Sequence, residues 1–196
     1  AAATTMAALR VAGDLRGTSV LILGCGMLGL TAAAALHDLG AALIVAVDVD
    51  PDRARRARHF GATIACMAGP GLGDQLPLLA PHGFDVALEL SGSTAAAAVG
   101  LESLGIGGQL ILVGAVKPVA PMAIDPEDIV RRRLVIQGVH NYLPVDLREG
   151  LGLLGRSAAP FESLIGPPHS IDRVLDAVAH AAEHGFLRAL ITPDRR

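Results

Sequence analysis

Aromatic residues are scarce in this chain: they make up 3% of its 196 residues, and tryptophan is absent. Because alanine is abundant at the same time, we interpret this as a compositional bias and not as a functional feature. The chain has only two cysteines, Cys25 and Cys66. Two thiols cannot make a disulfide framework or a four-ligand structural zinc site. This cysteine usage is typical of a protein of the reducing cytoplasm.

Charge is also sparse. Charged residues make up 18% of the chain, the net charge is −3, and no block of basic residues occurs, which argues against a nucleic-acid-binding surface. Hydrophobic residues, at 52%, are numerous enough to form a core and exclude intrinsic disorder. The length suits one domain with room for an appendage.

The chain shows no signal peptide, and one stretch that could pass for a membrane helix has a better explanation. The chain begins Ala-Ala-Ala-Thr-Thr-Met, without an initiator Met or the basic start of a signal peptide, so we expect it to be the middle of a longer protein. Residues 17–36 carry no charge and match the roughly 20 residues that a membrane helix needs. A β-branched run, a glycine turn and an alanine-rich segment nevertheless explain this stretch better as strand, turn and helix. We therefore expect no membrane span.

From Ser19 onward, short apolar runs alternate with helical segments. The expected strands are 19–23, 43–47, 63–65, 85–89, 109–113 and 134–139. The expected helices are 27–39, 52–60, 94–103, one that begins at a cap on Asp125, 146–154, and one between Ser170 and Gly185, before a last short strand at 188–191. Strands that alternate with helices indicate parallel crossovers and an α/β fold. We expect a doubly wound Rossmann sheet of six parallel strands, with a C-terminal helical extension and a short return strand.

A glycine-rich turn follows the first expected strand. Gly24, Gly26 and Gly29 form the pattern G-x-G-x-x-G, and this pattern gains weight because a strand precedes it, a helix follows, and an acidic residue lies about 20 residues further on. The first glycine allows the tight turn, the second lets a pyrophosphate approach the backbone, and the third lets the helix pack on the strand. The free N–H groups and positive end of that helix favour phosphate.

The acidic residue is Asp48, at the end of the second expected strand. Its carboxylate can accept hydrogen bonds from both hydroxyls of an adenosine ribose and would repel a 2′-phosphate, which favours NAD over NADP. Arg53, Arg55 and Arg56 follow closely and weaken this preference, unless they form the exposed face of a helix. Asp50 is the alternative acid, but it lies past the strand.

The remaining reactive side chains point to structural roles. Cys25 lies inside the turn and is either a reactive thiol at a helix N-terminus or, as we favour, a small packing residue, and Cys66 is also expected to pack. The histidines show no metal-ligand spacing, and His180 and His184 are interpreted as surface residues near a helix end. Arginines 131–133 are expected to form a solvated helix end that complements the dipole.

Several segments along the chain match the sequence pattern of one known family. They are 17–30, 45–53, 59–63, 85–89 with 91–92, 108–114, 137–139 and 187–188. Together they resemble the medium-chain, zinc-type alcohol dehydrogenases, and the resemblance extends from about residue 3 to residue 192. Within that family, 125–132 and 138–142 resemble a subgroup of dehydrogenases proposed for phosphonate catabolism.

The resemblance implies a set of cofactor contacts. The glycine turn and the backbone after it would hold the pyrophosphate of NAD, Asp48 the adenosine ribose, and Arg53 the adenine side. The carboxyl ends of the later strands would meet the nicotinamide half, and Arg188 would reach the pyrophosphate unless it is only a surface charge. The residues assigned to the cofactor in this way are Gly24, Gly26, Met27, Leu28, Gly29, Asp48, Arg53, Ser91, Gly92, Val113, Gly114, Ala115, Val139, Asn141 and Arg188.

The family's catalytic zinc is held by an N-terminal domain, and no zinc ligand, catalytic residue or substrate pocket can be assigned in this chain. The resemblance implies a linker or helix from a missing catalytic domain at 1–18, an NAD-binding Rossmann domain at 19–142, and C-terminal helices with a return strand at 143–196. Zinc is expected only in the full-length protein, where it would polarise the alcohol oxygen. The implied partners are NAD, a small alcohol or aldehyde bound through the missing domain, and a second copy paired along the edge strand 134–139.

Three functions were weighed. The first is the NAD-binding domain of a zinc-type alcohol dehydrogenase, which transfers hydride reversibly between an alcohol and nicotinamide. The second is a zinc-free quinone or enoyl reductase, which the spacing of the glycine turn disfavours. The third is a non-enzymatic, nucleotide-sensing Rossmann domain, which the helices and Arg188 beyond Val139 disfavour. Fold alone does not separate them, and we expect the first.

Overall fold

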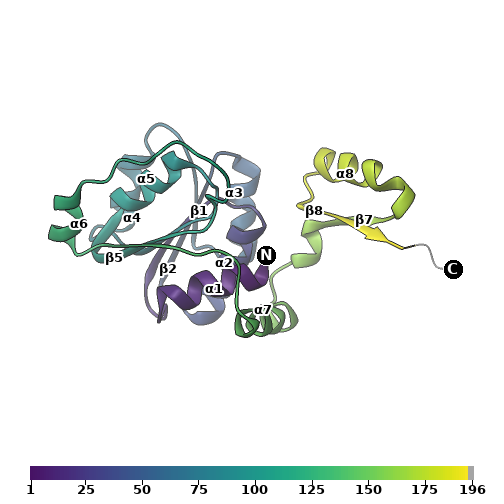
Figure 1. Cartoon of the computed structure of the whole chain (residues 1–196), viewed down its shortest axis with the longest axis horizontal. Coiled ribbons are helices and arrows are strands. Elements are labelled where there is room, and N and C mark those ends of the chain that lie inside the picture. The colour runs from purple at the N-terminus through teal and green to yellow at the C-terminus, as the bar shows by residue number, and fades with distance from the viewer. Residues whose placement is uncertain (194–196) are drawn as a thin grey trace. The chain divides into compact units, whose positions relative to one another are not determined.

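The computed structural model describes residues 1–193 and divides the chain into two compact units, the first ending at Ser157 and the second beginning at Ala158 (Figure 1). The first unit is built on a parallel sheet of six strands in the order β3-β2-β1-β4-β5-β6. This order confirms the expected doubly wound Rossmann sheet. The strands are β1 (Ser19–Leu23), β2 (Leu43–Asp48), β3 (Ile64–Met67), β4 (Phe84–Glu89), β5 (Leu104–Leu112) and β6 (Val135–Gly138).

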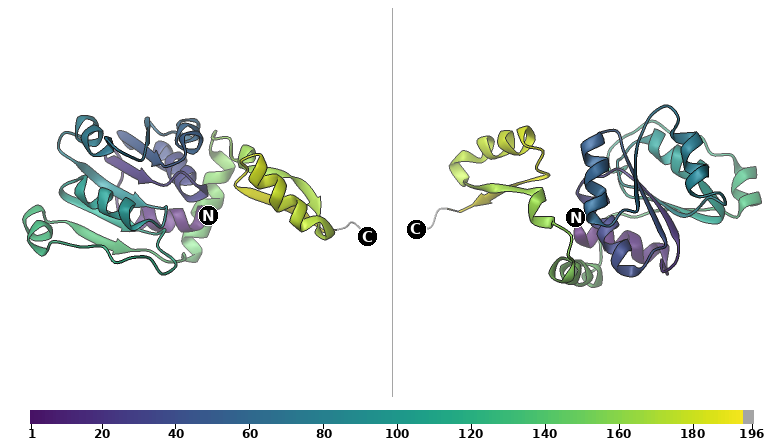
Figure 2. Two further views of the ribbon diagram at one scale, coloured as in Figure 1. Left: turned by 90° about the horizontal axis from the view of Figure 1, so that it is seen from above. Right: turned by 180° about the vertical axis from the view of Figure 1, so that it is seen from behind.

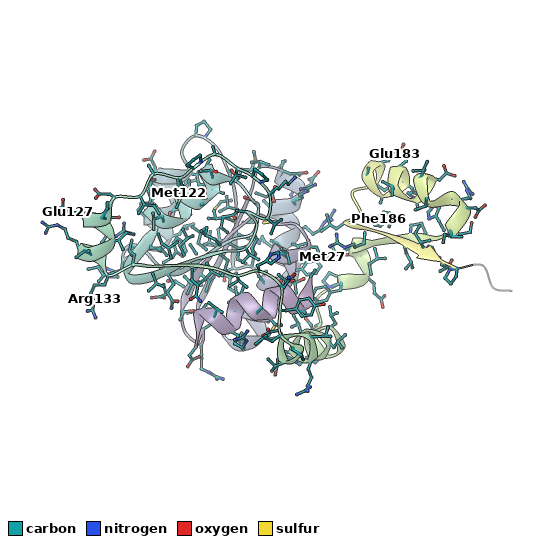
Figure 3. The ribbon with its side chains drawn as sticks, in the orientation of Figure 1. Met27, Met122, Glu127, Arg133, Glu183 and Phe186 are labelled. Atoms are coloured by element: carbon teal, nitrogen blue, oxygen red, sulfur yellow. The ribbon has the colours of Figure 1, made fainter. Side chains whose placement is uncertain are left out.

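Helices cover both faces of this sheet. They are α1 (Ala2–Ala12), α2 (Met27–Leu39), α3 (Pro51–Ala57) with a 3-10 turn at Arg58–Phe60, α4 (Leu72–Leu79), α5 (Thr94–Glu102), α6 (Pro126–Arg132) and α7 (Pro144–Arg156). On one face, Leu21 and Leu23 of β1 pack in a core with residues of α4 and α5, and Met122 packs against the same core (Figure 3). Successive strand residues point to opposite faces, so Ile22 faces α2.

Local signals set most of the helix ends. Asp125 accepts a hydrogen bond from the Glu127 backbone and caps α6 as expected, and Pro126 takes the first helical position. Gly40 follows α2 with φ 80°, in the left-handed region that a helix C-terminus favours. These ends were predictable because a cap depends only on neighbouring residues.

Two elements were not expected. Helix α4 lies in a segment rich in glycine and proline, yet Leu72 and Leu76 are both buried and give it an apolar face. The second is β7 (Ile165–Ser170), which lies in a stretch read as a connection because it contains consecutive prolines. Proline removes a ladder donor and is tolerated at sheet edges. Strand β7 pairs only with β8 (Arg188–Thr192), so this proline pair lies in an edge strand.

The second unit forms a small β-α-β arrangement. A 3-10 turn at Phe161–Leu164 precedes β7. Strands β7 and β8 are parallel, and a second 3-10 turn at Ile171–Arg173 and helix α8 (Val174–Glu183) connect them (Figure 2). The return strand expected at 188–191 is confirmed, with one residue more at its end. Around α8, the rings of His180 and His184 lie 4.3 Å apart, and His180 also contacts Phe186, which Figure 3 labels.

The first unit extends beyond residue 142, where a domain boundary was expected, because α7 packs against α1. Arg10 donates from Nε to Oδ1 of Asp146 at 2.7 Å and from Nη2 to Oδ2 at 3.1 Å, and the Leu143 backbone also donates to Oδ2 at 2.7 Å. The Asp146 side chain is only 1% exposed. At Gly150 of α7, an added Cβ would lie 2.9 Å from the Ala3 nitrogen, so the two helices approach closely.

Of the three arginines at the end of α6, Arg132 departs from the expected solvated helix end, whereas Arg131 and Arg133 are exposed. Arg131 forms an exposed pair with Glu127, as a surface residue would. Arg132 pairs with Asp128 at 2.7 Å but also donates from Nη2 to the carbonyl oxygen of Leu104, and it is largely buried. Because the last carbonyls of a helix lack partners within the helix, a cation from a neighbouring element can satisfy the groups around the end of α5.

The Arg10–Asp146 pair predicts an acid-sensitive contribution to stability. The hydrogen bond from Arg10 is the main cause that holds the pKa of Asp146 below its ordinary value; burial opposes it, and the Leu143 N–H adds to it. A carboxyl whose folded pKa is lowered stabilises the fold above its unfolded pKa of about 4, and this stabilisation is lost as the pH falls through the folded pKa. Asp146→Asn should therefore lower Tm by about 5 °C at neutral pH, with a smaller difference from the parent in acid.

Thermal melts at a series of pH values test this prediction. Asp52→Asn is the matched control, because the Asp52 pair with Arg55 is exposed and such pairs contribute little. A Tm difference for Asp146→Asn that stays constant with pH would contradict the prediction.

Candidate cofactor-binding site

The glycine turn adopts the geometry that its spacing predicts. Gly24 has φ 105°, and a Cβ there would lie 2.8 Å from the Ser91 nitrogen. At Gly29 a Cβ would lie 1.9 Å from the Gly24 carbonyl oxygen. At Gly26, by contrast, an added Cβ meets no atom within 4 Å, and α2 starts next to it without a side-chain cap. The fold itself therefore requires the first and third glycines, whereas the second faces open space beside the N–H groups of a helix N-terminus.

Asp48 lies at the end of β2 and is tied to this turn. Its Oδ2 accepts a hydrogen bond from the Cys25 backbone at 2.6 Å, and its Oδ1 accepts one from the Asp50 backbone at 3.0 Å. The residue is 8% exposed. Because each carboxylate oxygen can accept more than one hydrogen bond, both remain able to bind a further donor. The backbone N–H groups thus fix the orientation of a carboxylate that still has accepting capacity.

The alternative acid, Asp50, has a different task. Its Oδ1 accepts from the backbones of Asp52 at 2.8 Å and Arg53 at 3.3 Å, so it caps α3. These two bonds, together with nearby arginines, lower the pKa of Asp50. The structure therefore places Asp48, and not Asp50, beside the glycine turn.

A pocket of about 550 Å³ opens between the ends of β1, β2 and β4. It brings together five of the predicted residues, Gly24, Gly26, Asp48, Arg53 and Ser91. The residues that line it without having been predicted are Leu23, Val47, Val49, Ala68, Gly69, Leu72, Gly73, Leu90, Ser93, Ala95, Ala96 and Val99. Several of these come from α4 and the segment before it, whose approach to the sheet no local pattern indicated.

The cation at this pocket is Arg53, whose Nε lies 3.7 Å from Oδ2 of Asp50. It is half exposed and contributes to the pocket wall. Arg55 instead pairs with Asp52 on the exposed side of α3. Of these two arginines, the structure brings Arg53 to the pocket and leaves Arg55 at the surface.

Cys25 is fully buried within the turn. Burial, followed by the negative charge of Asp48, raises the pKa of its thiol to about 12. A thiol is a poor nucleophile compared with a thiolate, so this residue acts as a small packing group at neutral pH. Cys66 in β3 is also buried, and burial raises its pKa as well.

Glu89, at the end of β4, shapes the next loop. Its Oε1 accepts three hydrogen bonds at 2.7 Å each, from the backbone and hydroxyl of Ser91 and from the backbone of Gly92. Its side chain is buried, with 1% of the residue exposed. The sequence analysis gave Glu89 no role, although an acid at the end of an apolar strand before Ser-Gly is a usable signal. This carboxylate fixes the two loop residues that were predicted to face the cofactor.

The loops after β4 and β5 are in close contact. Gly92 has φ 76°, and a Cβ there would lie 2.6 Å from the Gly114 carbonyl oxygen. A Cβ at Gly114 would lie 2.2 Å from the Gly92 nitrogen. The predicted pairs Ser91-Gly92 and Val113-Gly114 therefore lie side by side.

A second pocket, of about 610 Å³, lies at the ends of β5 and β6. It brings together Val113, Ala115 and Val139 from the predicted set, and the Val139 backbone donates to the Leu112 carbonyl at 2.9 Å. Its other lining residues are Leu112, Val116, Lys117, Pro118, Gly138 and His140. Asn141 has φ 62° and lies next to this pocket in sequence but does not line it.

Met27 and Leu28 form the first turn of α2, beside Gly26 (Figure 3). The hydroxyl of Thr5, from α1, donates to the Leu28 carbonyl at 3.3 Å. Arg188 lies on β8 in the second unit and donates to the Leu187 carbonyl, so its contact with a pyrophosphate stays a prediction.

No zinc site fits the residues that the structure describes. Between residues 1 and 193, no group of three or more His, Cys, Asp or Glu side chains lies close enough to hold a metal ion. Within the same range, no helix is both long and apolar enough to cross a membrane.

Comparison with known proteins gives consistent matches. The chain is 39% identical over 129 residues to the L-threonine 3-dehydrogenase of Shewanella oneidensis, a match that covers 65% of this chain and 37% of that protein. The fold is similar to that of an alcohol dehydrogenase from Thermotoga maritima, with a TM-score of 0.89 and 21% identity over 98% of this chain and 55% of the other. It is also similar to a zinc-binding dehydrogenase from Sinorhizobium meliloti bound to NADP, with a TM-score of 0.78 and 24% identity over 90% and 53% of the two chains.

These matches span only part of the related proteins: 37% of the threonine dehydrogenase and about half of each related structure. At such low identity the two structures show the fold alone. A family model described as zinc-binding dehydrogenase matches residues 28–156, which is most of the chain. This chain therefore belongs to the zinc-binding dehydrogenases, the zinc-type medium-chain alcohol dehydrogenase family, and it fits their cofactor-binding half.

Proposed function

We propose that this chain is the NAD-binding part of a zinc-type alcohol dehydrogenase that transfers hydride reversibly between an alcohol and nicotinamide. The observation that carries the proposal is Asp48, a carboxylate fixed by two backbone N–H groups at a pocket that begins at the glycine turn. The family match favours this function over a zinc-free reductase or a nucleotide-sensing domain.

The adenosine half of NAD would occupy the pocket between β1, β2 and β4. The pyrophosphate would lie at Gly26, where the backbone has open space and the N–H groups of Met27 and Leu28 begin α2. Asp48 would accept from the ribose hydroxyls, and Arg53 would flank the adenine. Because two backbone N–H groups hold the Asp48 carboxylate, this side chain needs little ordering on binding.

Asp48 also accounts for a preference between cofactors. The carboxylate is held by the backbones of Cys25 and Asp50, so it cannot turn away from a 2′-phosphate. Two negative groups in contact repel each other, and this repulsion is stronger in a pocket than in water. Arg53 partly offsets it, but this arginine also lies near Asp50. NAD is therefore the proposed cofactor, and NADP is the competing candidate.

The nicotinamide half would extend across the ends of β4, β5 and β6. It supplies the carbon that accepts or releases the hydride. The loops at Ser91-Gly92 and Gly114 would support the ring and its ribose, in positions fixed by Glu89. The backbone between Val139 and Asn141 would bind the carboxamide. Apolar residues of the second pocket, including Val113, would exclude water from one side of the ring.

The catalytic zinc and most of the substrate pocket are proposed to lie in a part of the protein outside this chain. Among residues 1–193, no group of side chains fits a zinc site. A cytoplasmic location and membership of the phosphonate-catabolism subgroup remain predictions from the sequence.

Cofactor binding is predicted to depend on the charge of Asp48. Isothermal calorimetry should show tighter binding of NAD than of NADP. Asp48→Asn should weaken NAD binding about tenfold, because a charged acceptor is lost. The variant should also show a smaller difference in affinity between NAD and NADP. Asp52→Asn, which changes an exposed acid on the following helix α3, should bind both nucleotides as the parent does. Equal affinities in the parent, or tighter NADP, would overturn the assignment of Asp48.

Two glycines of the turn are predicted to have different roles, one in cofactor binding and the other in folding. Gly26→Ala should fold normally, because its Cβ meets no protein atom, yet bind NAD at least about tenfold more weakly, because the methyl group occupies the proposed phosphate position. Gly29→Ala should lower Tm because its Cβ collides with the Gly24 carbonyl. Gly155→Ala, with open space at its Cβ, is the control for both measurements. Parent-like NAD binding by Gly26→Ala would contradict the phosphate assignment.

A homodimer paired through β6 is predicted. This strand forms one edge of the six-stranded sheet, and its Val135 is 44% exposed. An uncovered edge strand can pair with another chain. In a two-fold interface each substitution occurs in both chains, so its effect counts twice. Light scattering should show a dimer for the parent and for Ile136→Val, and a monomer that still binds NAD for Ile136→Pro, which lacks a ladder donor. A parent that is monomeric at high micromolar concentration would refute the prediction.

A further inference from the structure

The chain contains a single lysine, Lys117, in the segment that follows β5. It lines the pocket of about 610 Å³ at the ends of β5 and β6, together with His140 from the segment after β6. The two segments meet only because β5 and β6 are neighbours in the parallel sheet. The fold thus brings the one lysine and a histidine to the same pocket.

The charge around Lys117 is not balanced by the protein. None of the residues that line this pocket is acidic, and the other lining residues are apolar or glycine. Within residues 1–193, Lys117 has no ion-pair partner, whereas Arg53, Arg131 and Arg132 each pair with a carboxylate on their own helix or next to it. A cation that no neighbouring carboxylate neutralises gives this exposed pocket a positive potential, which favours an anion.

The cofactor's own anionic group does not account for this cation. Its pyrophosphate is proposed to lie at Gly26, beyond the end of β1, and the sheet order places β4 between β1 and β5. Two strand spacings correspond to about 10 Å, so the phosphates and this pocket are separate. Val113, Ala115 and Val139, which line the pocket, are the residues proposed to contact nicotinamide. The carbon that exchanges hydride with nicotinamide must lie against the ring, so the rest of the pocket faces the substrate.

We propose that Lys117 and His140 bind an anionic group of the substrate, so that this enzyme acts on an alcohol that carries a carboxylate or a phosphorus oxyanion. The inference rests on the proposed function, because it takes the nicotinamide position from there. Lys117 donates from its ammonium group to the anion, and His140 donates from a ring nitrogen. Neither residue takes part in hydride transfer: they determine specificity, since a neutral alcohol of the same shape gains nothing from the cation.

The single lysine makes a direct test possible. Protein grown with ¹³C-labelled lysine gives the side-chain NMR signals of Lys117 alone. The labelled chain is saturated with NAD and titrated with acetate, with methylphosphonate, and with acetamide as the neutral counterpart of acetate. We expect a saturable shift of the Lys117 Cε signal with at least one anion and none with acetamide. The stronger of the two anions identifies the substrate's anionic group.

Variants then separate a pocket from a general surface effect. In ¹⁵N-labelled protein the backbone signals of Ala115 and Val139 report on the pocket. Lys117→Met, which keeps the length of the side chain, should weaken anion binding about fivefold or more, and His140→Gln should weaken it less. Arg148→Met removes an exposed cation of α7 that does not line the pocket, and it should leave anion binding unchanged.

Each of the other outcomes contradicts either the anion site or the proposed function. No saturable shift with either anion, or an equal shift with acetamide, overturns the anion site while NAD binding still supports the proposed function. Displacement of NAD by the anion shows that Lys117 serves the cofactor, and this also overturns the inference. Failure of the parent to bind NAD overturns the proposed function and the inference that rests on it.

Discussion

The hydrogen bond from the Cys25 backbone to Asp48, 2.6 Å long, joins the two features on which the candidate site depends. One is the glycine turn after β1, and the other is the acid at the end of β2. The bond holds the carboxylate at the pocket wall, next to the N-terminus of α2. It also places a negative charge beside the Cys25 thiol, which is one reason why that thiol stays protonated. This contact therefore links the orientation of the carboxylate, the position of the turn and the protonation of the Cys25 thiol.

Loops at the carboxyl edge of the sheet also pack closely against one another. Gly24 lies against Ser91, and Gly92 lies against Gly114, at distances that leave no room for a side chain. Glu89 binds the loop after β4 from beneath with three hydrogen bonds to one oxygen. Backbone therefore approaches backbone where the loops after β1, β4 and β5 meet. A cofactor can come close to the chain at such glycines because they carry no side chain.

The two pockets differ in the charge that the protein presents. The pocket at β1 and β2 contains the carboxylate of Asp48, with Arg53 at its wall. The pocket at β5 and β6 contains no acid and carries Lys117 and His140. Parallel strands that end at one edge bring these opposite environments into one row. The proposed ribose-binding carboxylate and the proposed anion-binding pair therefore lie at opposite ends of one site.

The sequence by itself determined the features that arise from neighbouring residues. The glycine turn, the alternation of strands and helices, the cap at Asp125 and the position of Asp48 could all be read from short segments, because their causes are local. The tertiary structure decided what depends on the approach of distant segments. It tied Asp48 to the Cys25 backbone, placed Glu89 against the loop after β4, packed α7 against α1 and brought Lys117 and His140 to one pocket. Helix α4 and strand β7 escaped the sequence analysis for the same reason: burial and edge position, which arise only in the folded chain, outweigh the local signals of glycine and proline.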